Sequence, residues 1–410
     1  VDALPNFKFQ ISSFDIGIRG CGQIMVIKYF FSAPKGDIPV GAEDLQRPFL
    51  RSAGERHPFL TLGDYFEAIK DFILRDHGRS LVTILLEQLK TDISPDRINE
   101  ILIRTEKHGA LYHLASVEVF SGRQSLKMCV STAVSANGKA WLKHECDLLK
   151  FLNSKLPLPY LPVPYFEGDI KIRSDCGNES MSMFLTEWFE NYHEWHLSMD
   201  KKGEKKGVRV WDLRNGHWFA SKEQGFEIFR QASKILTLYY DTTDFNQIYP
   251  WHHAAGDFIV RSKDGIIDVK LTTARKYEPI MLFSSKDTID PVVALTYFFL
   301  NLSIRMRLDR LDGVGVRAWA GGFSVDALIR GFFEGLRIME AHGRYGLGQV
   351  RDLLSLFKDF DREELAGLFY PLLDMYAKED PGDFLVIQAN LGSHVQQLYE
   401  AIQDFHLRDD

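Results

Sequence analysis

The hydrophobic period changes along this chain, and the change limits the folds that it can adopt. Over residues 112–188 apolar and polar residues mostly alternate, as in half-buried strands, with one helical stretch inserted. From residue 225 onward apolar residues instead recur every three or four positions, as in amphipathic helices. This order predicts an α+β protein with a β-rich first part and a helical second part.

The length of the chain predicts more than one structural unit. At 410 residues it exceeds what a single hydrophobic core usually organises, so two or three units are expected. Hydrophobic residues make up 45% of the chain and charged residues 26%, which is typical of a packed protein. We expect an N-terminal extension over 1–95, a β-rich lobe over 96–190 and a helical lobe over 191–410.

The N-terminal extension is predicted to contain both strands and helices. β-branched residues separated by glycines indicate short strands within 7–31. Thr61 and Asp64 form a capping-box pattern ahead of a helical period over 62–90. The Ser94-Pro95 pair then predicts a short helix that ends before Gly109.

The β-rich lobe is predicted to start with a hairpin, in which strands over 112–120 and 124–132 flank a turn at Gly122. The other elements expected in it are a helix over 138–152 and strands over 164–174 and 181–188.

The helical lobe is interrupted by one short hairpin over 258–271, where Lys263-Asp264-Gly265 is a turn signal. The helices expected around it cover 225–240, 290–308, 324–341, 348–358, 362–378 and 393–405.

Charge and hydropathy argue against two classes of partner. The formal net charge is −7, whereas a general nucleic-acid binder needs clustered lysines and arginines; the one dense basic run, 201–206, reads as a loop. The longest apolar run, 292–304, is shorter than the about 20 residues of a membrane-spanning helix. We therefore expect neither nucleic acid nor a membrane as a partner.

The cysteines favour a reducing compartment. Cys21, Cys129, Cys146 and Cys176 lie far apart and form no CxxC pair, so neither a disulfide framework nor a zinc ribbon is indicated. The first ten residues lack the basic start and long apolar stretch of a secretion signal. A cytoplasmic location is expected.

Lys127 and Glu145 are the first pair of candidate site residues. Lys127 lies among apolar residues of the second hairpin strand, and Glu145 follows 18 residues later on the next helix. A glutamate placed in this way can orient a lysine towards the phosphates of a nucleotide. Alternatively, Lys127 is an exposed strand residue and Glu145 a solvated helix position.

Asp257 and Asp268 are the second pair, expected at the ends of the hairpin over 258–271. Mg²⁺ prefers hard oxygen ligands and needs only one or two protein carboxylates besides phosphates and water. The two residues therefore predict a magnesium site, although both could instead serve as turn or cap acceptors.

These segments together resemble the protein-kinase-like superfamily, and most closely its aminoglycoside and choline phosphotransferase branch. The resemblance rests on Gly256-Asp257-Phe258-Ile259-Val260, on Ile267-Asp268 and on the Lys127 and Glu145 pair. The segment 184–189 is similar to the hinge between the two lobes of that fold.

The resemblance implies a two-lobed fold that binds ATP and Mg²⁺ and transfers phosphate to a hydroxyl of a small molecule or a protein. In that arrangement Lys127 steadies the phosphates and Glu145 orients Lys127. Asp257 and Asp268 hold the metal, and the hinge, including Glu187 and Phe189, meets the adenine.

The chain departs from the family pattern at the catalytic loop. His252 stands where the family has its catalytic aspartate, five residues before Asp257, and Asp257 replaces an asparagine. A histidine can act as a general base near neutrality, so His252 is expected to replace the aspartate as base. The alternative is a catalytically degenerate pseudokinase that binds nucleotide or acts as a scaffold. A glycine-rich phosphate loop is also missing, with only Gly109 ahead of the hairpin.

Two weaker signals lie near these segments. His193 and His196 have the HxxH spacing of metal ligands but are better interpreted as surface or packing residues, because no third ligand is close in sequence. Arg275 follows Asp268 and is expected either to meet an anionic substrate or to face solvent.

Overall fold

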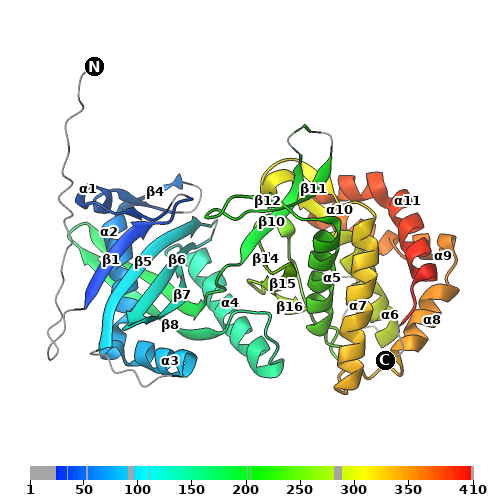
Figure 1. Ribbon diagram of the computed structural model, residues 1–410, viewed down its shortest axis with the longest axis horizontal. Coiled ribbons are helices and arrows are strands. Elements are labelled where there is room, and N and C mark those ends of the chain that lie inside the picture. The colour runs from blue at the N-terminus through cyan, green and yellow to red at the C-terminus, as the bar shows by residue number, and fades with distance from the viewer. Residues whose placement is uncertain are drawn as a thin grey trace. The chain divides into compact units, whose positions relative to one another are not determined.

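The computed structural model describes residues 25–407 except 35, 52–53, 91–96, 110, 201, 204 and 281–288. The strands predicted before residue 25, Cys21 and the Ser94-Pro95 helix start lie outside the described residues. The described chain is a mixed α+β structure, β-rich in its N-terminal part and mainly helical in its C-terminal part (Figure 1).

The chain forms two compact units. The first comprises Val1–Cys146 and Val163–Trp188, and the second comprises Asp147–Pro162 and Phe189–Asp410. The chain thus leaves the first unit for the last time between Trp188 and Phe189, within the segment predicted as a hinge. The described residues of the predicted extension, up to position 90, share the first unit with the hairpin strands.

A seven-stranded sheet is the centre of the first unit. Its strand order is β2-β1-β5-β6-β7-β9-β8, with β1 and β5 parallel and the other neighbours antiparallel. The strands are β1 (Val26–Phe31), β2 (Ile38–Pro39), β5 (Ile98–His108), β6 (His113–Ser121), β7 (Gln124–Ala133), β8 (Pro164–Ser174) and β9 (Gly177–Glu187). The predicted hairpin and the two later strands are therefore confirmed.

The helix predicted to run from Ser94-Pro95 to Gly109 is wrong over its described part, because β5 occupies Ile98–His108. Ile101 and Ile103 alternate into the core, and β1 and β6 supply hydrogen-bond partners on both sides of the strand. A serine and proline pair favours a helix start locally, but pairing within the sheet prevails.

Helices cover one face of this sheet, and their apolar side chains form the hydrophobic core of the unit together with those of the strands. Thr61 accepts a hydrogen bond from the Asp64 backbone N–H, so the predicted capping box starts α2 as expected. Phe66 and Phe72 of α2 belong to the same buried cluster as Ile103, Val117 and Met183 of the strands. The remaining elements are β3 (Pro48–Leu50), β4 (Arg56–Thr61), α1 (Ala42–Leu45), α2 (Leu62–Ile73), η2 (Arg75–Gly78), α3 (Arg79–Leu89) and α4 (Ala136–Lys155), whose residues from Asp147 onward belong to the second unit.

The second unit contains a five-stranded sheet of order β12-β11-β10-β14-β15. The hairpin of β14 (Phe258–Lys263) and β15 (Ile266–Leu271) confirms the prediction for 258–271. No strand was predicted for β10 (His193–Met199), β11 (Lys206–Val210) or β12 (Trp218–Phe219). Polar residues such as His196 and Ser198 are buried in β10, so its sequence lacks the alternation of a half-buried strand.

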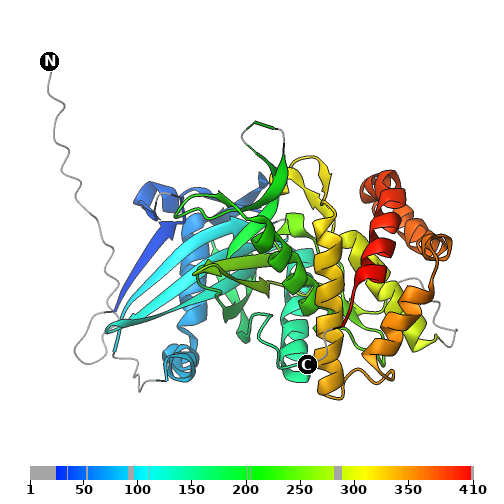
Figure 2. The same cartoon turned by 45° about the vertical axis from the view of Figure 1, so that its right-hand side comes forward.

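Helices make up most of the rest of the second unit. Helices α5 and α7 lie side by side in both views (Figures 1 and 2). The helix predicted over 362–378 is two helices, and α11 begins at Pro381 and not at 393. The elements are α5 (Lys222–Leu238), α6 (Pro291–Arg305), α7 (Phe323–Ala341), α8 (Val350–Asp359), α9 (Arg362–Gly367), α10 (Tyr370–Glu379), α11 (Pro381–Asp404), η4 (His253–Ala255) and η5 (Leu311–Gly313), with the short strand pairs β13 (Gln247–Ile248) and β16 (Tyr277–Glu278), and β17 (Leu308–Arg310) and β18 (Arg317–Trp319).

Candidate functional site

The predicted catalytic loop connects β13 to β14 in the second unit. His252 is in an extended conformation, a single turn of η4 follows, and Gly256 adopts the left-handed region at φ 73°. A Cβ at Gly256 would lie 2.6 Å from a carboxylate oxygen of Glu194, so both the backbone angle and the close approach require glycine. This turn directs the chain so that Asp257 enters β14 with its side chain inside the unit.

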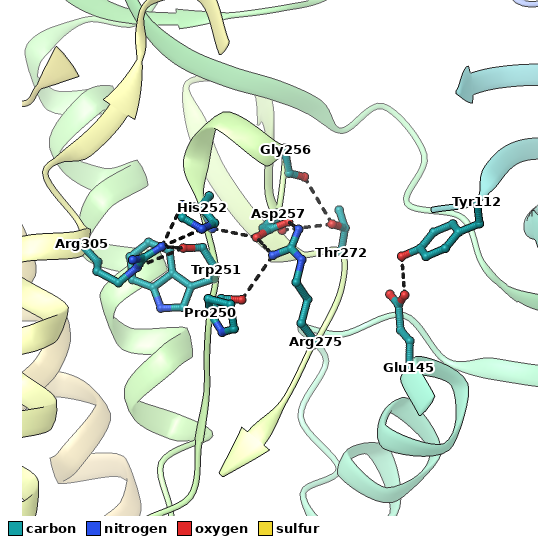
Figure 3. A network of polar contacts seen from close by, with 10 residues as sticks. All are labelled: Tyr112, Glu145, Pro250, Trp251, His252, Gly256, Asp257, Thr272, Arg275 and Arg305. Carbon is teal, nitrogen blue, oxygen red and sulfur yellow. Dashed lines mark hydrogen bonds and ion pairs between the residues drawn. The ribbon is translucent and has the colours of Figure 1, made fainter. Parts of the chain in front are cut away.

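The Asp257 carboxylate is buried and fully engaged by the protein itself. Only 1% of the residue is exposed. Arg275 binds both carboxylate oxygens, with Nη2 2.6 Å from Oδ1 and Nη1 in contact with Oδ2 (Figure 3). The backbone N–H of His252 donates to Oδ2 at 2.8 Å. A buried carboxylate in a bidentate pair with arginine has its charge compensated and its lone pairs used.

His252 is held next to a second arginine, Arg305 of α6. The Arg305 guanidinium is buried, lies 2.8 Å from Nδ1 of His252 and donates to the Trp251 carbonyl at 2.7 Å (Figure 3). Burial, reinforced by Arg305 and Arg275, lowers the pKa of His252 to about 3. The imidazole is therefore neutral at physiological pH and a much weaker base than an ordinary histidine.

Asp257 and Asp268 are not brought together. In the hairpin, Asp268 pairs with Arg261, whereas the Asp257 carbonyl accepts from the backbone N–H of Thr272. Four residues of strand, about 13 Å, separate Asp268 from Thr272. Since Mg²⁺ requires oxygens at about 2.1 Å, one ion cannot bind both carboxylates. Asp268 instead accepts from Tyr192 Oη at 2.5 Å and Arg261 Nη2 at 3.0 Å.

Lys127 and Glu145 belong to one polar cluster in the first unit. Lys127 Nζ lies 3.4 Å from Glu106 Oε1 and 4.0 Å from the centre of the Trp188 ring, and only 11% of its side chain is exposed. Glu145 accepts a hydrogen bond from Tyr112 (Figure 3). The Lys127 side chain is thus largely enclosed, and the alternative of a freely exposed strand lysine does not apply.

The pKa of the Cys129 thiol responds to the charges of this cluster. Burial, together with the negative charges of Glu106 and Glu145, raises the pKa of Cys129 to about 12, while Thr186 and Lys127 act in the opposite direction. Glu106 was missed because 98–108 was interpreted as a helix. In β5, Glu106 lies where the pairing with β6 shifts register, between Thr105 and Lys107, and Ser116 of β6 donates to it at 2.6 Å.

The predicted hinge residues lie on either side of the unit boundary. Glu187 ends β9, where its backbone N–H donates to the Val163 carbonyl at 2.9 Å. Phe189 is in the second unit, with its ring centre 5.6 Å from that of Tyr192 and 5.7 Å from Lys270 Nζ.

The two histidines of the HxxH pattern have separate carboxylate partners. His193 lies 3.5 Å from Asp212, and His196 lies 3.5 Å from Asp309 and 3.7 Å from Glu194. Within the described parts of the chain, no three His, Cys, Asp or Glu side chains are grouped so as to hold a metal ion. Cys129, Cys146 and Cys176 are not joined in disulfides.

Comparisons with known proteins identify no family for this chain, so its function is inferred from the geometry of the site. The chain matches no protein-family model and has no significant match among curated proteins. In the described residues no helix combines the length and apolar character needed to cross a membrane. The first unit offers a largely buried cation, Lys127, on its sheet. The second unit contains a loop in which Asp257 is paired with Arg275 and His252 is held against Arg305.

Proposed function

We propose that this chain is a kinase-like protein that binds a nucleoside triphosphate and does not transfer its phosphate. The observation that carries the proposal is the bidentate pair of Arg275 with the buried Asp257. Of the two functions that the sequence left open, phosphotransferase and pseudokinase, this contact favours the second.

Phosphoryl transfer depends on a metal ion that neutralises charge and on a residue that positions or deprotonates the acceptor. Asp257 would have to release Arg275 before it could bind Mg²⁺, and Asp268 is too far along the hairpin to share the same ion. His252, with a pKa of about 3, is a poor proton acceptor at neutral pH. Losing a positioned base alone typically costs about 10² to 10⁴ in rate.

Nucleotide binding is proposed at the polar cluster around Lys127. The Lys127 ammonium is partly desolvated and is paired with one carboxylate, Glu106, at 3.4 Å. A triphosphate offers the same ammonium a stronger anionic partner, and Trp188 provides an aromatic face beside it. Because neither Asp257 nor Asp268 is arranged to share a metal ion, binding is expected without Mg²⁺.

The test is thermal unfolding with ATP, in Mg²⁺ and in EDTA, combined with an assay for release or transfer of γ-labelled phosphate. ATP at 100 times its dissociation constant should stabilise the protein by about 2.7 kcal/mol in both buffers. Lys127→Met should remove the shift in melting temperature. Lys171→Met is the matched control, because Lys171 is an exposed lysine of β8 in the same unit and should leave the shift unchanged.

Two outcomes contradict the proposal. If ATP does not change the melting temperature of the wild type, the chain is not a nucleotide-binding protein. If phosphate is transferred in a Mg²⁺-dependent reaction that His252→Ala abolishes, the protein is a phosphotransferase that uses His252 as its base.

A further inference from the structure

A polar pocket in the second unit lies outside all the residues considered so far for nucleotide binding. It has a volume of about 570 Å³, within the usual range for small-molecule sites. Its walls come from the start of β10 and the residues just before it, the loop after β11, β12, the start of α5 and the end of β14. We call it the β10–β14 pocket.

Two cations of β14 line one side of this pocket. Arg261 is 41% exposed and uses one guanidinium nitrogen for Asp268. Lys263 is exposed, and among the described residues it has no ion-pair partner. Arginine and lysine together are suited to a phosphate or carboxylate, because both present several N–H donors and neither accepts hydrogen bonds.

The pocket also contains an acidic residue, Asp212, whose carboxylate is engaged by neighbouring groups of the protein. Asp212 accepts from the backbone N–H groups of Arg214 and Asn215 at 2.9 and 2.8 Å, and from the Asn215 side chain at 3.0 Å. Burial would raise the pKa of Asp212, but these hydrogen bonds from Asn215 and the nearby His193 hold it below its usual value. Its lone pairs are thus largely used inside the protein.

His193 is positioned by Asp212 to contact a neutral polar group. Its Nε2 lies 3.5 Å from the Asp212 carboxylate, and burial lowers the pKa of the imidazole. The carboxylate favours the proton on Nε2, which leaves Nδ1 as a hydrogen-bond acceptor. A hydroxyl group on a ligand could donate to that nitrogen.

Trp218 and two amide side chains complete the walls. Trp218 of β12 is partly exposed and presents an apolar ring, while Asn191 and Gln224 add side-chain donors and acceptors. A ligand that fits the β10–β14 pocket has an anionic end, several hydroxyls and an apolar ring face.

We propose that the β10–β14 pocket binds a small hydroxylated anion of the sugar-phosphate class. Arg261 and Lys263 hold the phosphate, His193 accepts from a hydroxyl, and Trp218 contacts the ring. The proposal does not depend on nucleotide binding at Lys127, since no residue is common to the two sites.

The experiment is calorimetric titration of the full chain with glucose 6-phosphate, glucose and inorganic phosphate. Glucose 6-phosphate should bind more tightly than either fragment, because only it satisfies both ends of the pocket. Lys263→Gln should weaken its binding about fivefold, the effect of losing one partly exposed charge contact. His193→Gln should weaken binding of glucose 6-phosphate but not that of inorganic phosphate.

Lys378→Gln, an exposed lysine of α10 outside the pocket, is the matched control and should bind like the wild type. Lys127→Met should also bind glucose 6-phosphate normally, which separates this site from the nucleotide site. Absence of binding by glucose 6-phosphate, equal affinity for inorganic phosphate, or equal loss in Lys263→Gln and Lys378→Gln would each overturn the proposal.

Discussion

Buried polar groups of the second unit repeatedly have an arginine as partner. Arg275 binds Asp257, Arg305 contacts His252, and Arg307 lies 3.2 Å from Nδ1 of the buried His394. A guanidinium brings several donors and a permanent charge, so each contact engages the polar atoms of its partner. Polar groups that could serve in acid–base chemistry are therefore engaged in contacts that stabilise the fold.

We predict that Arg275→Ala destabilises the protein by about 2–3 kcal/mol. The change leaves the Asp257 carboxylate buried with only the His252 N–H as partner, and an uncompensated buried charge is costly. The expected loss lies below the range for fully buried pairs, because the Arg275 side chain is 32% exposed. Urea unfolding at pH 7 measures it.

The double variant Arg275→Ala, Asp257→Asn is the informative companion, because it also removes the orphaned charge. It should be more stable than Arg275→Ala alone. If Arg275→Ala is as stable as the wild type, the ion pair of Arg275 with Asp257 does not stabilise the folded loop.

We predict that His196 stabilises the folded protein at neutral and acidic pH and that this stabilisation is lost at alkaline pH. Burial would lower the pKa of this imidazole, but its contacts with Asp309 and Glu194 outweigh burial and raise it to about 9. The pKa in the unfolded chain is about 6.5. The stabilisation is therefore fully present below pH 6.5 and is lost as the pH rises through 9.

His196→Gln should accordingly lower the free energy of unfolding at pH 6 by up to about 3 kcal/mol more than at pH 9.5. Urea unfolding of both proteins at the two pH values measures the difference. An equal loss at both values would show that His196 contributes only packing.

At the scale of elements, α5 and α7 pack closely because glycines of α7 face α5. A Cβ on Gly331 would collide with the Arg230 carbonyl and lie 2.9 Å from the Ser233 Cβ, and one on Gly335 would lie 2.8 Å from the Thr237 Cβ. Glycine is unfavourable inside a helix by about 1 kcal/mol relative to alanine. Here the close approach of the two helices offsets that cost.

We therefore predict that Gly331→Ala destabilises the protein by about 2 kcal/mol or more, although alanine is the better helix former. Gly392→Ala is the control, because Gly392 lies inside α11 and nothing lies within 4 Å of a Cβ there. That change should stabilise by about 0.5–1 kcal/mol. Melting temperatures of both variants test the prediction, which is wrong if the two changes have the same sign.

At the scale of the whole molecule, the two units should respond differently to acid. Burial is the main cause that lowers the pKa of His252 and His394 to about 3 and that of His253 to about 4. All three belong to the second unit, whereas in the first unit burial lowers the pKa of His57. A histidine kept neutral in the folded state costs stability once the unfolded chain can take up the proton.

We predict that the second unit loses stability first as the pH falls from 6.5 towards 4. Each of these histidines contributes a loss of up to about 1.4 kcal/mol per pH unit in that interval. Hydrogen exchange followed by mass spectrometry at pH 7 and pH 5 should show a larger loss of protection in α6 and α11 than in β6 and β7. The reverse order would contradict the assignment of the neutral histidines.

The sequence by itself determined the elements whose signals are local. Hydrophobic period located the β6–β7 hairpin, the β14–β15 hairpin and most helices, and side-chain capping fixed the start of α2 at Thr61. It also singled out Lys127, Glu145, His252 and Asp257 as polar residues in suggestive positions. These patterns depend on neighbours within a few residues, so they can be read without the fold.

Tertiary structure decided what those residues contact. β5 became a strand only because β1 and β6 flank it, and Glu106 thereby became the partner of Lys127. Arg275 and Arg305 lie 18 and 53 positions from Asp257 and His252, the groups that they contact, and no local pattern indicates such pairing. The protonation state of His252 follows from burial and from those arginines, which is why spacing alone left open whether it acts as a base.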